Sequence, residues 1–297
     1  MNSAFINARI IDPAQGLDKI GTLIVVDAKI AAIGKNVDVP ANMQTLDCGG
    51  KALIPGLIDM QVFTGEPGEE HRETLATASQ AAAAGGVTAM VTMQNTNPVI
   101  DDAALVDFIS RRARDTAIVR VHPMAALTMG CNGKNMSEFG LLSEAGAVGF
   151  TDGDRAVMHA LTMRRALSYA ATFDALIVQH AMDADLQSAG VMHEGELATR
   201  LGLAGIPVAA ETVMIDRDLR LVELTGGRYH IAQISAAESV ATVRAAKKRG
   251  LSVSCGVSAT HLMLNQNDVE NYRSFAKVNP PLRREEDRLA LIAGVAD

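Results

Sequence analysis

The strand that opens the main domain of this chain reads Ile54-Pro55-Gly56-Leu57-Ile58-Asp59-Met60-Gln61-Val62-Phe63. Side chains two residues apart on a strand point to the same face, so Gln61 and Phe63 should lie together at its end. Two histidines in these positions could bind one metal ion, whereas a glutamine amide is a poor zinc ligand and a phenyl ring is none. The end of this strand is therefore predicted to be a poor metal site.

Beyond residue 53 the sequence alternates short apolar strands with helical segments. This alternation is typical of parallel βαβ units and predicts an α/β fold. Later strands are expected at residues 87–93, 118–122, 148–151, 176–180, 229–235 and 251–257. After the strand at 229–235, Ser235-Ala236-Ala237-Glu238 has the spacing of a capping box, and the helix that it predicts ends near Gly250.

The first part of the chain follows another pattern. Apolar and polar residues alternate around turn signals at residues 4–6, 22–26 and 29–34. Such short runs predict antiparallel strands that form part of a β-sandwich. Two domains are therefore expected, a β-sandwich part at residues 1–52 and a (β/α) domain at residues 53–297.

Composition excludes several classes of function. With 297 residues, of which 48% are hydrophobic, the chain can bury a sizeable core. Its formal net charge of −7 gives no basic surface for nucleic acid or an anionic membrane. Cys48, Cys131 and Cys255 are odd in number and far apart, which predicts free thiols in a reducing compartment. No charged and apolar leader pattern or long apolar run is present, so a cytoplasmic protein is expected.

Five further motifs follow the strand at 54–63 in an order that resembles the dihydroorotases of the amidohydrolase superfamily. They are Gly-Gly-Val-Thr at 85–88, Met-Gln-Asn-Thr-Asn-Pro at 93–98, Gly-Ala-Val-Gly-Phe-Thr-Asp at 146–152, Gly-Val-Met-His-Glu-Gly-Glu at 190–196 and Lys-Val-Asn-Pro-Pro-Leu-Arg at 277–283. The resemblance implies a (β/α)8 TIM-like barrel with a small β-sandwich. It also implies hydrolysis of the ring amide of dihydroorotate, or the reverse cyclisation, by a zinc-activated water.

The metal positions implied by this resemblance hold unsuitable residues. The His-x-His pair is replaced by Gln61 and Phe63, an expected aspartate by Gly153, and a later histidine by Gln233. Only His180 keeps the expected imidazole, and it is either a residual metal ligand or a hydrogen-bonded structural histidine. The expectation is no zinc or weak zinc, and not a full dinuclear site.

The substrate-binding positions implied by the family give a mixed result. Gly65 stands where an arginine is expected to bind the substrate carboxylate. Asn95 and Asn279 remain, either as substrate-binding residues or as ordinary loop residues. Asp152 and Asp154 are weak candidates for catalysis, because a small loop shift could bring either toward His180.

The chain ends at residues 293–297, where the resemblance places the start of the last barrel strand. About seven strands are expected in a barrel that should close with eight. The expectation is that the sequence lacks the last barrel strand and the C-terminal sandwich strands; the alternative is a natural protein shorter than its relatives.

The sequence favours a catalytically impaired dihydroorotase homologue that serves pyrimidine biosynthesis as a non-catalytic partner of aspartate transcarbamoylase. This role is implied by the resemblance, since some dihydroorotase-like chains are structural subunits of that enzyme. A homo- or hetero-oligomer is expected. The alternative is an active, divergent dihydroorotase or other cyclic amidohydrolase with a rebuilt single-metal site.

Overall fold

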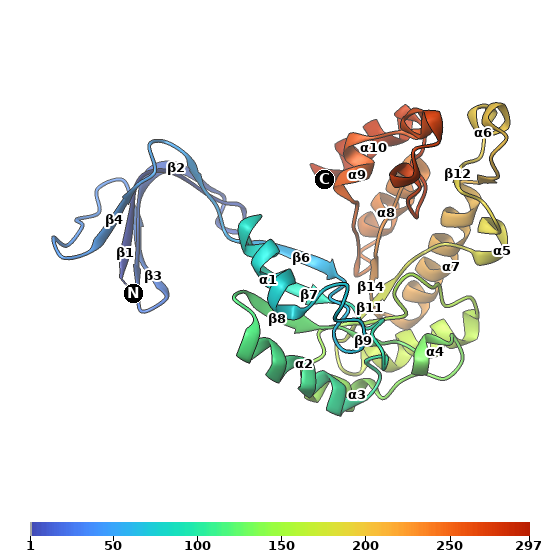
Figure 1. Ribbon diagram of the computed structural model, residues 1–297, viewed down its shortest axis with the longest axis horizontal. Coiled ribbons are helices and arrows are strands. Elements are labelled where there is room, and N and C mark those ends of the chain that lie inside the picture. The colour runs from blue at the N-terminus through green and yellow to red at the C-terminus, as the bar shows by residue number, and fades with distance from the viewer. Residues whose placement is uncertain (1) are drawn as a thin grey trace. The chain divides into compact units, whose positions relative to one another are not determined.

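The computed structural model describes residues 2–297, which form two compact units (Figure 1). The first unit runs to Leu57 and includes Gly86–Thr88, and the second comprises Ile58–Gly85 and Ala89–Asp297. That residues 1–52 and 53–297 are separate domains stays a prediction. No helix of residues 2–297 combines the length and the apolar character needed to span a membrane.

The first unit is a sheet built on two antiparallel hairpins. Its elements are β1 (Ser3–Asp12), η1 (Pro13–Gln15), β2 (Leu17–Val26), β3 (Lys29–Gly34), β4 (Gln44–Asp47) and β5 (Ala52–Leu53). The order is β3-β2-β1-β4, and β5 also pairs with β1. The predicted antiparallel pairing is confirmed for β1 with β2 and β2 with β3, whereas β4 and β5 run parallel to β1.

The second unit alternates strands and helices. Its strands are β6 (Leu57–Val62), β7 (Val87–Thr92), β8 (Arg120–Pro123), β9 (Ala125–Ala126), β10 (Phe150–Thr151), β11 (Leu176–Gln179), β12 (Met192–His193), β13 (Gly205–Ile206), β14 (Arg228–Ile231) and β15 (Val253–Cys255). They form sheets of order β6-β7-β8, β15-β14-β11-β10-β9 and β12-β13. The pairs β7–β8, β11–β14 and β14–β15 are parallel, which confirms the predicted βα pattern.

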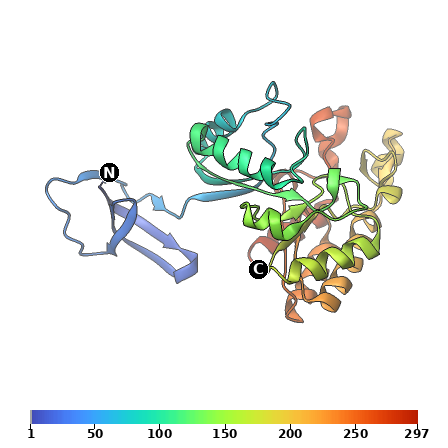
Figure 2. The same cartoon turned by 90° about the horizontal axis from the view of Figure 1, so that it is seen from below.

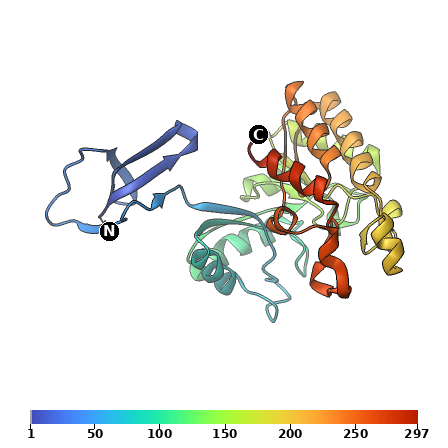
Figure 3. The same ribbon diagram turned by 90° about the horizontal axis from the view of Figure 1, so that it is seen from above.

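Helices connect these strands and cover them on the outside. They are α1 (Leu75–Ala84), α2 (Ala103–Thr116), α3 (Phe139–Glu144), α4 (Ala160–Ala171), α5 (Ala184–Gln187), α6 (Glu196–Leu201), α7 (Ala209–Thr225), α8 (Ala237–Lys248), α9 (Ala259–Met263) and α10 (Glu285–Val295), with short 3-10 turns η2 (Met129–Cys131), η3 (Gln266–Tyr272) and η4 (Ser274–Ala276). Figure 2 shows α4 on the outer side of the strands, and Figure 3 shows α8 and α10 side by side.

The core of the second unit lies between the strands and these helices. Helix α2 begins at its N-cap Asp102 and turns Val106, Ile109 and Ala113 inward at helical spacing. The rings of Phe139 and Phe150 stack with centroids 4.3 Å apart. This packing supports the ends of β10 and β11, which Asp152 and His180 directly follow.

Candidate functional site

The end of β6 places Gln61 and Phe63 where the sequence predicts them, one on the strand and one directly after it. The Gln61 amide nitrogen, Nε2, is buried and lacks a hydrogen-bond partner. The Arg72 guanidinium lies over the Phe63 ring, 4.8 Å from its centroid. The amide nitrogen of Gln61 and the phenyl ring of Phe63 offer no lone pair to a metal ion, and the amide oxygen of Gln61 is a poor zinc ligand.

In the loop after β10, both carboxylate oxygens of Asp152 accept hydrogen bonds. Asp152 is 3% exposed, and its Oδ1 accepts a hydrogen bond of 2.8 Å from the Thr128 backbone N–H. Its Oδ2 accepts a second one, of 2.5 Å, from the Thr128 hydroxyl. Burial raises the pKa of Asp152, and the bonds from Thr128 oppose that shift. Asp152 therefore anchors the loop, whereas Asp154 is exposed.

Two glycines at family positions are required by the backbone. Gly153 has φ +73°, and an added Cβ would lie 2.9 Å from the Gln94 side-chain nitrogen. Gly65 has φ +69°, and an added Cβ would lie 2.6 Å from the Glu69 carbonyl oxygen. An L side chain is strained at such φ in both positions, and at Gly65 the backbone carbonyl obstructs it as well.

His180 follows β11, and the structure brings it close to Asn279 and Asp154. Its ring is 7% exposed, and Nε2 is buried without a hydrogen-bond partner. Burial lowers the pKa of His180, and the charges of Asp154 and Glu211 and the nearby Asn279 side chain oppose the shift. Gln233, after β14, is half-buried, and Asn95 is exposed.

The residues at the family's metal positions 61, 63, 153 and 233 are poor zinc ligands. Among residues 2–297, no three or more His, Cys, Asp and Glu side chains are grouped so that they could hold a metal ion. Catalytic zinc sites in proteins have three protein ligands, so the side chains present around His180 do not fit zinc.

A buried ionic network that was not predicted from the sequence lies next to this region. Glu211 of α7 and the Arg283 side chain are almost fully buried, with Glu211 Oε2 3.9 Å from Arg283 Nη2. Glu211 Oε1 accepts hydrogen bonds from the Ser235 backbone N–H at 2.9 Å and from the Ser239 hydroxyl at 2.5 Å. Arg283 donates to the Ser235 hydroxyl at 3.0 Å and to the Ile206 carbonyl at 2.7 Å. The network joins α7, β13 and the start of α8 to the segment that carries Asn279.

The predicted capping box at Ser235 is wrong, although the helix is present. The N-cap of α8 is Ala236, and it makes no side-chain capping bond. The Ser235 hydroxyl bonds Glu211 instead, and Asp287 of α10 accepts the Ala237 N–H at 2.8 Å. Acidic side chains from other helices therefore cap α8. One feature of the sequence could have indicated the buried network: an acidic residue, Glu211, stands among apolar residues at the start of α7.

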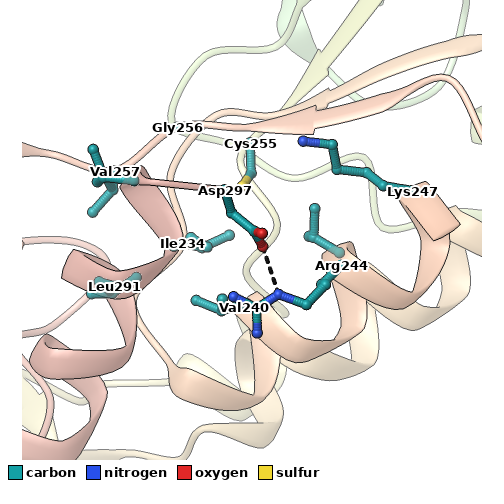
Figure 4. A pocket seen from close by; sticks show the side chains of 12 residues that line it. Ile234, Val240, Arg244, Lys247, Cys255, Gly256, Val257, Leu291 and Asp297 are labelled. Atoms are coloured by element: carbon teal, nitrogen blue, oxygen red, sulfur yellow. Dashed lines mark hydrogen bonds and ion pairs between the residues drawn. The ribbon is translucent and has the colours of Figure 1, made fainter.

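A cavity of about 290 Å³ lies away from all of these residues, between α8, α10 and the end of β15 (Figure 4). Its wall is mostly apolar and includes Ile234, Val240 and Leu291. An ion pair of 2.5 Å between Arg244 and Asp297 crosses its edge. None of the sequence-predicted site residues lines this cavity.

Comparison with known proteins identifies the family. A family model described as dihydro-orotase-like matches residues 50–239. The chain belongs to the dihydroorotase family. It is 45% identical over 291 residues to a dihydroorotase of Anaeromyxobacter sp. (strain K), covering 97% of this chain and 67% of that one. It is 44% identical to a dihydroorotase of Syntrophobacter fumaroxidans, covering 100% of this chain and 68% of that one.

Solved structures agree with the fold of a dihydroorotase homologue. The L-hydantoinase of Arthrobacter aurescens superposes with a TM-score of 0.82 at 24% identity, covering 97% of this chain and 65% of the hydantoinase. A D-hydantoinase from Thermus sp. superposes with a TM-score of 0.76 at 20% identity, covering 99% of this chain and 66% of that one. The α/β fold is therefore consistent with part of an amidohydrolase barrel plus a β-sandwich. The chain spans about two thirds of the length of these relatives.

Proposed function

We propose that this dihydroorotase homologue is catalytically impaired and serves pyrimidine biosynthesis as a non-catalytic partner of aspartate transcarbamoylase. The observation that carries the proposal is the environment of His180, whose Nε2 is buried and unpartnered with no cluster of further ligands around it. Asp152, one of the two candidate catalytic carboxylates, has both oxygens bonded to Thr128. One imidazole alone cannot form a catalytic zinc site.

The proposal includes the barrel plan of the family. We propose that the second unit follows the eight-stranded (β/α) arrangement, because its parallel strands alternate with helices in the required order. The small sheet of the first unit would then be part of the β-sandwich. This arrangement would place residues 61, 63, 153, 180 and 233 at strand ends on one face of the barrel.

Zinc content tests the degenerate site. Purified full-length protein dialysed against a mild chelator should retain less than one zinc per chain, because Gln61, Phe63, Gly153 and Gln233 provide no imidazole or carboxylate donors. Elemental analysis measures the ratio. Any substoichiometric zinc should fall further in the His180→Ala variant. Two equivalents of retained zinc would contradict the proposal.

A second candidate function is a divergent cyclic amidohydrolase with one rebuilt metal site. It is favoured by the negative charge of Asp154 near His180, by the Asn279 side chain close to the same imidazole, and by the unpartnered Nε2 of that ring. One tightly bound zinc per chain together with turnover of a cyclic amide would establish this alternative. Both properties should then be lost in the Asp154→Asn variant.

Binding to aspartate transcarbamoylase tests the partner role. The scaffold supports such a role because the buried Glu211 network and the folded helix α8 are intact although the pocket positions are degenerate. A stable interface should bury at least ~1,200 Å² and survive dilution on a sizing column. The two proteins from one organism should co-elute, while an unrelated barrel protein of similar mass should not. Separate elution together with unchanged transferase activity would exclude the role.

A further inference from the structure

The protonation of His193, at the end of β12, is fixed by its neighbours. Arg283 Nη1 lies 3.2 Å from His193 Nδ1, and a guanidinium can only donate, so Nδ1 is the acceptor. Burial, followed by the charges of Arg283 and Arg284, lowers the pKa of His193 to about 4, so the ring is neutral at pH 7. A neutral ring that accepts at Nδ1 carries its proton on Nε2.

That Nε2–H has no acceptor. His193 is 4% exposed, and its Nε2 is buried without a hydrogen-bond partner, as is Nη2 of Arg283. A buried donor left unbonded is unfavourable, so an orphaned N–H marks a place for an acceptor from outside the chain. Arg283 Nη2 has the Glu211 carboxylate 3.9 Å away, so His193 Nε2 is the donor without a counterpart. The positive charges of Arg283 and Arg284 near His193 favour an acceptor with negative charge.

Gly195 lies beside these donors. A Cβ added to Gly195 would find Arg284 Nη2 at 3.8 Å and His193 Nε2 at 4.0 Å as its near polar neighbours. The two nitrogens are therefore separated by no more than the sum of those distances. An oxyanion can bridge such a gap, because each of two oxygens can accept a hydrogen bond of about 2.9 Å.

Arg284 is the cation at this position that reaches solvent. Arg284 is half-exposed and places Nη1 3.4 Å from Glu286, which leaves Nη2 free to meet a ligand. The carboxylate of Asp287 is already occupied by the backbone N–H groups of Ala237 and Arg284. Glu194 and Glu196 are exposed to solvent, where their charge is screened.

We propose that His193 Nε2, Arg284 and the backbone at Gly195 form a binding site for a small oxyanion, a phosphate or carboxylate group. The buried imidazole supplies a neutral donor of fixed direction, and Arg284 supplies the charge. The site is separate from the degenerate positions at residues 61, 63, 153 and 233. It does not depend on the partner role, because binding is read from the isolated protein.

Phosphate binding to the full-length protein tests the site. Inorganic phosphate titrated at constant ionic strength, with chloride as the balancing anion, should raise the thermal midpoint in a saturable way. Repeating the phosphate titration in the presence of acetate distinguishes the ligand class. If acetate competes with phosphate, the site accepts carboxylates; if acetate does not compete, the site is selective for phosphate. A midpoint that responds equally to phosphate and chloride overturns the proposal.

Two variants and a matched control locate the binding. Gly195→Ala adds a methyl group between the two nitrogens without strain, since the backbone there is extended with φ 164°. Arg284→Gln removes the charge. Each of these two variants should raise the apparent Kd for phosphate by ~10-fold or more. The control variant Arg249→Gln, which removes an exposed arginine paired with Glu223, should leave the Kd unchanged. Wild-type affinity in both site variants overturns the proposal.

A spectroscopic measurement tests the role of the imidazole itself. With ¹⁵N-labelled histidine, the Nε2 resonance of His193, assigned by its loss in His193→Asn, should shift on phosphate addition. The histidine at position 261 provides an internal control, because its Nε2 lies 3.0 Å from the Pro280 carbonyl and is already bonded. A phosphate-insensitive His193 resonance under saturating phosphate overturns the assignment.

Discussion

Full-length protein should convert dihydroorotate or carbamoyl aspartate at a rate near background, with or without added zinc. Metal activation of water and of the scissile carbonyl removes several kcal/mol from the barrier, so its loss lowers turnover by on the order of 10³-fold or more. Gly65 also lacks the guanidinium expected to bind the substrate carboxylate, and the two losses should compound. Absorbance of dihydroorotate measures the rate, with the Anaeromyxobacter relative assayed in parallel.

Restoring only the two histidines at positions 61 and 63 should not rescue activity. The double variant Gln61→His and Phe63→His supplies two imidazoles, but Gly153 and Gly65 still provide no carboxylate and no guanidinium. Gln233 still gives no imidazole. Robust turnover by the unmodified protein would refute the impaired-enzyme proposal, and robust turnover by the double variant would show that the other positions are dispensable.

Removal of Glu211 should cause the largest loss of stability. The substitution Glu211→Ala leaves the buried Arg283 guanidinium without its counter-charge and leaves the Ser235 N–H without an acceptor. Breaking a buried ion pair in this way costs ~3–5 kcal/mol, a large part of the ~5–15 kcal/mol that separates a folded domain from its unfolded state. Urea unfolding followed by circular dichroism measures the change in the free energy of unfolding.

An exposed ion pair provides the matched control. Glu223 lies 3.3 Å from Arg249 with both side chains about half exposed, so Glu223→Ala should change the free energy of unfolding by less than ~1 kcal/mol. A Glu211→Ala protein as stable as the Glu223→Ala protein would show that the network contributes little. The segment that carries Asn279 would then be held mainly by other contacts.

Much of the architecture could be predicted from sequence because it depends on near neighbours. Period-two alternation predicts the hairpins of β1 to β3, and apolar runs followed by helical spacing predict β7, β8, β10, β11, β14 and β15. The family motifs predict the α/β fold that the hydantoinase structures share. The residue types at 61, 63, 65, 153 and 233 are likewise fixed by sequence, and so is the prediction that they cannot form a dinuclear zinc site.

Only the tertiary structure decided how the polar side chains pair. Ser235 has the local spacing of a capping box, but its hydroxyl bonds Glu211, which is 24 residues away. His193 receives its hydrogen bond from Arg283, 90 residues away, and that contact determines which ring nitrogen carries the proton. The spacing of apolar residues in a helix or strand shows which face of that element is buried. The hydrogen-bond partner of a side chain depends on which distant segment folds against that face. Local spacing therefore cannot identify the partner.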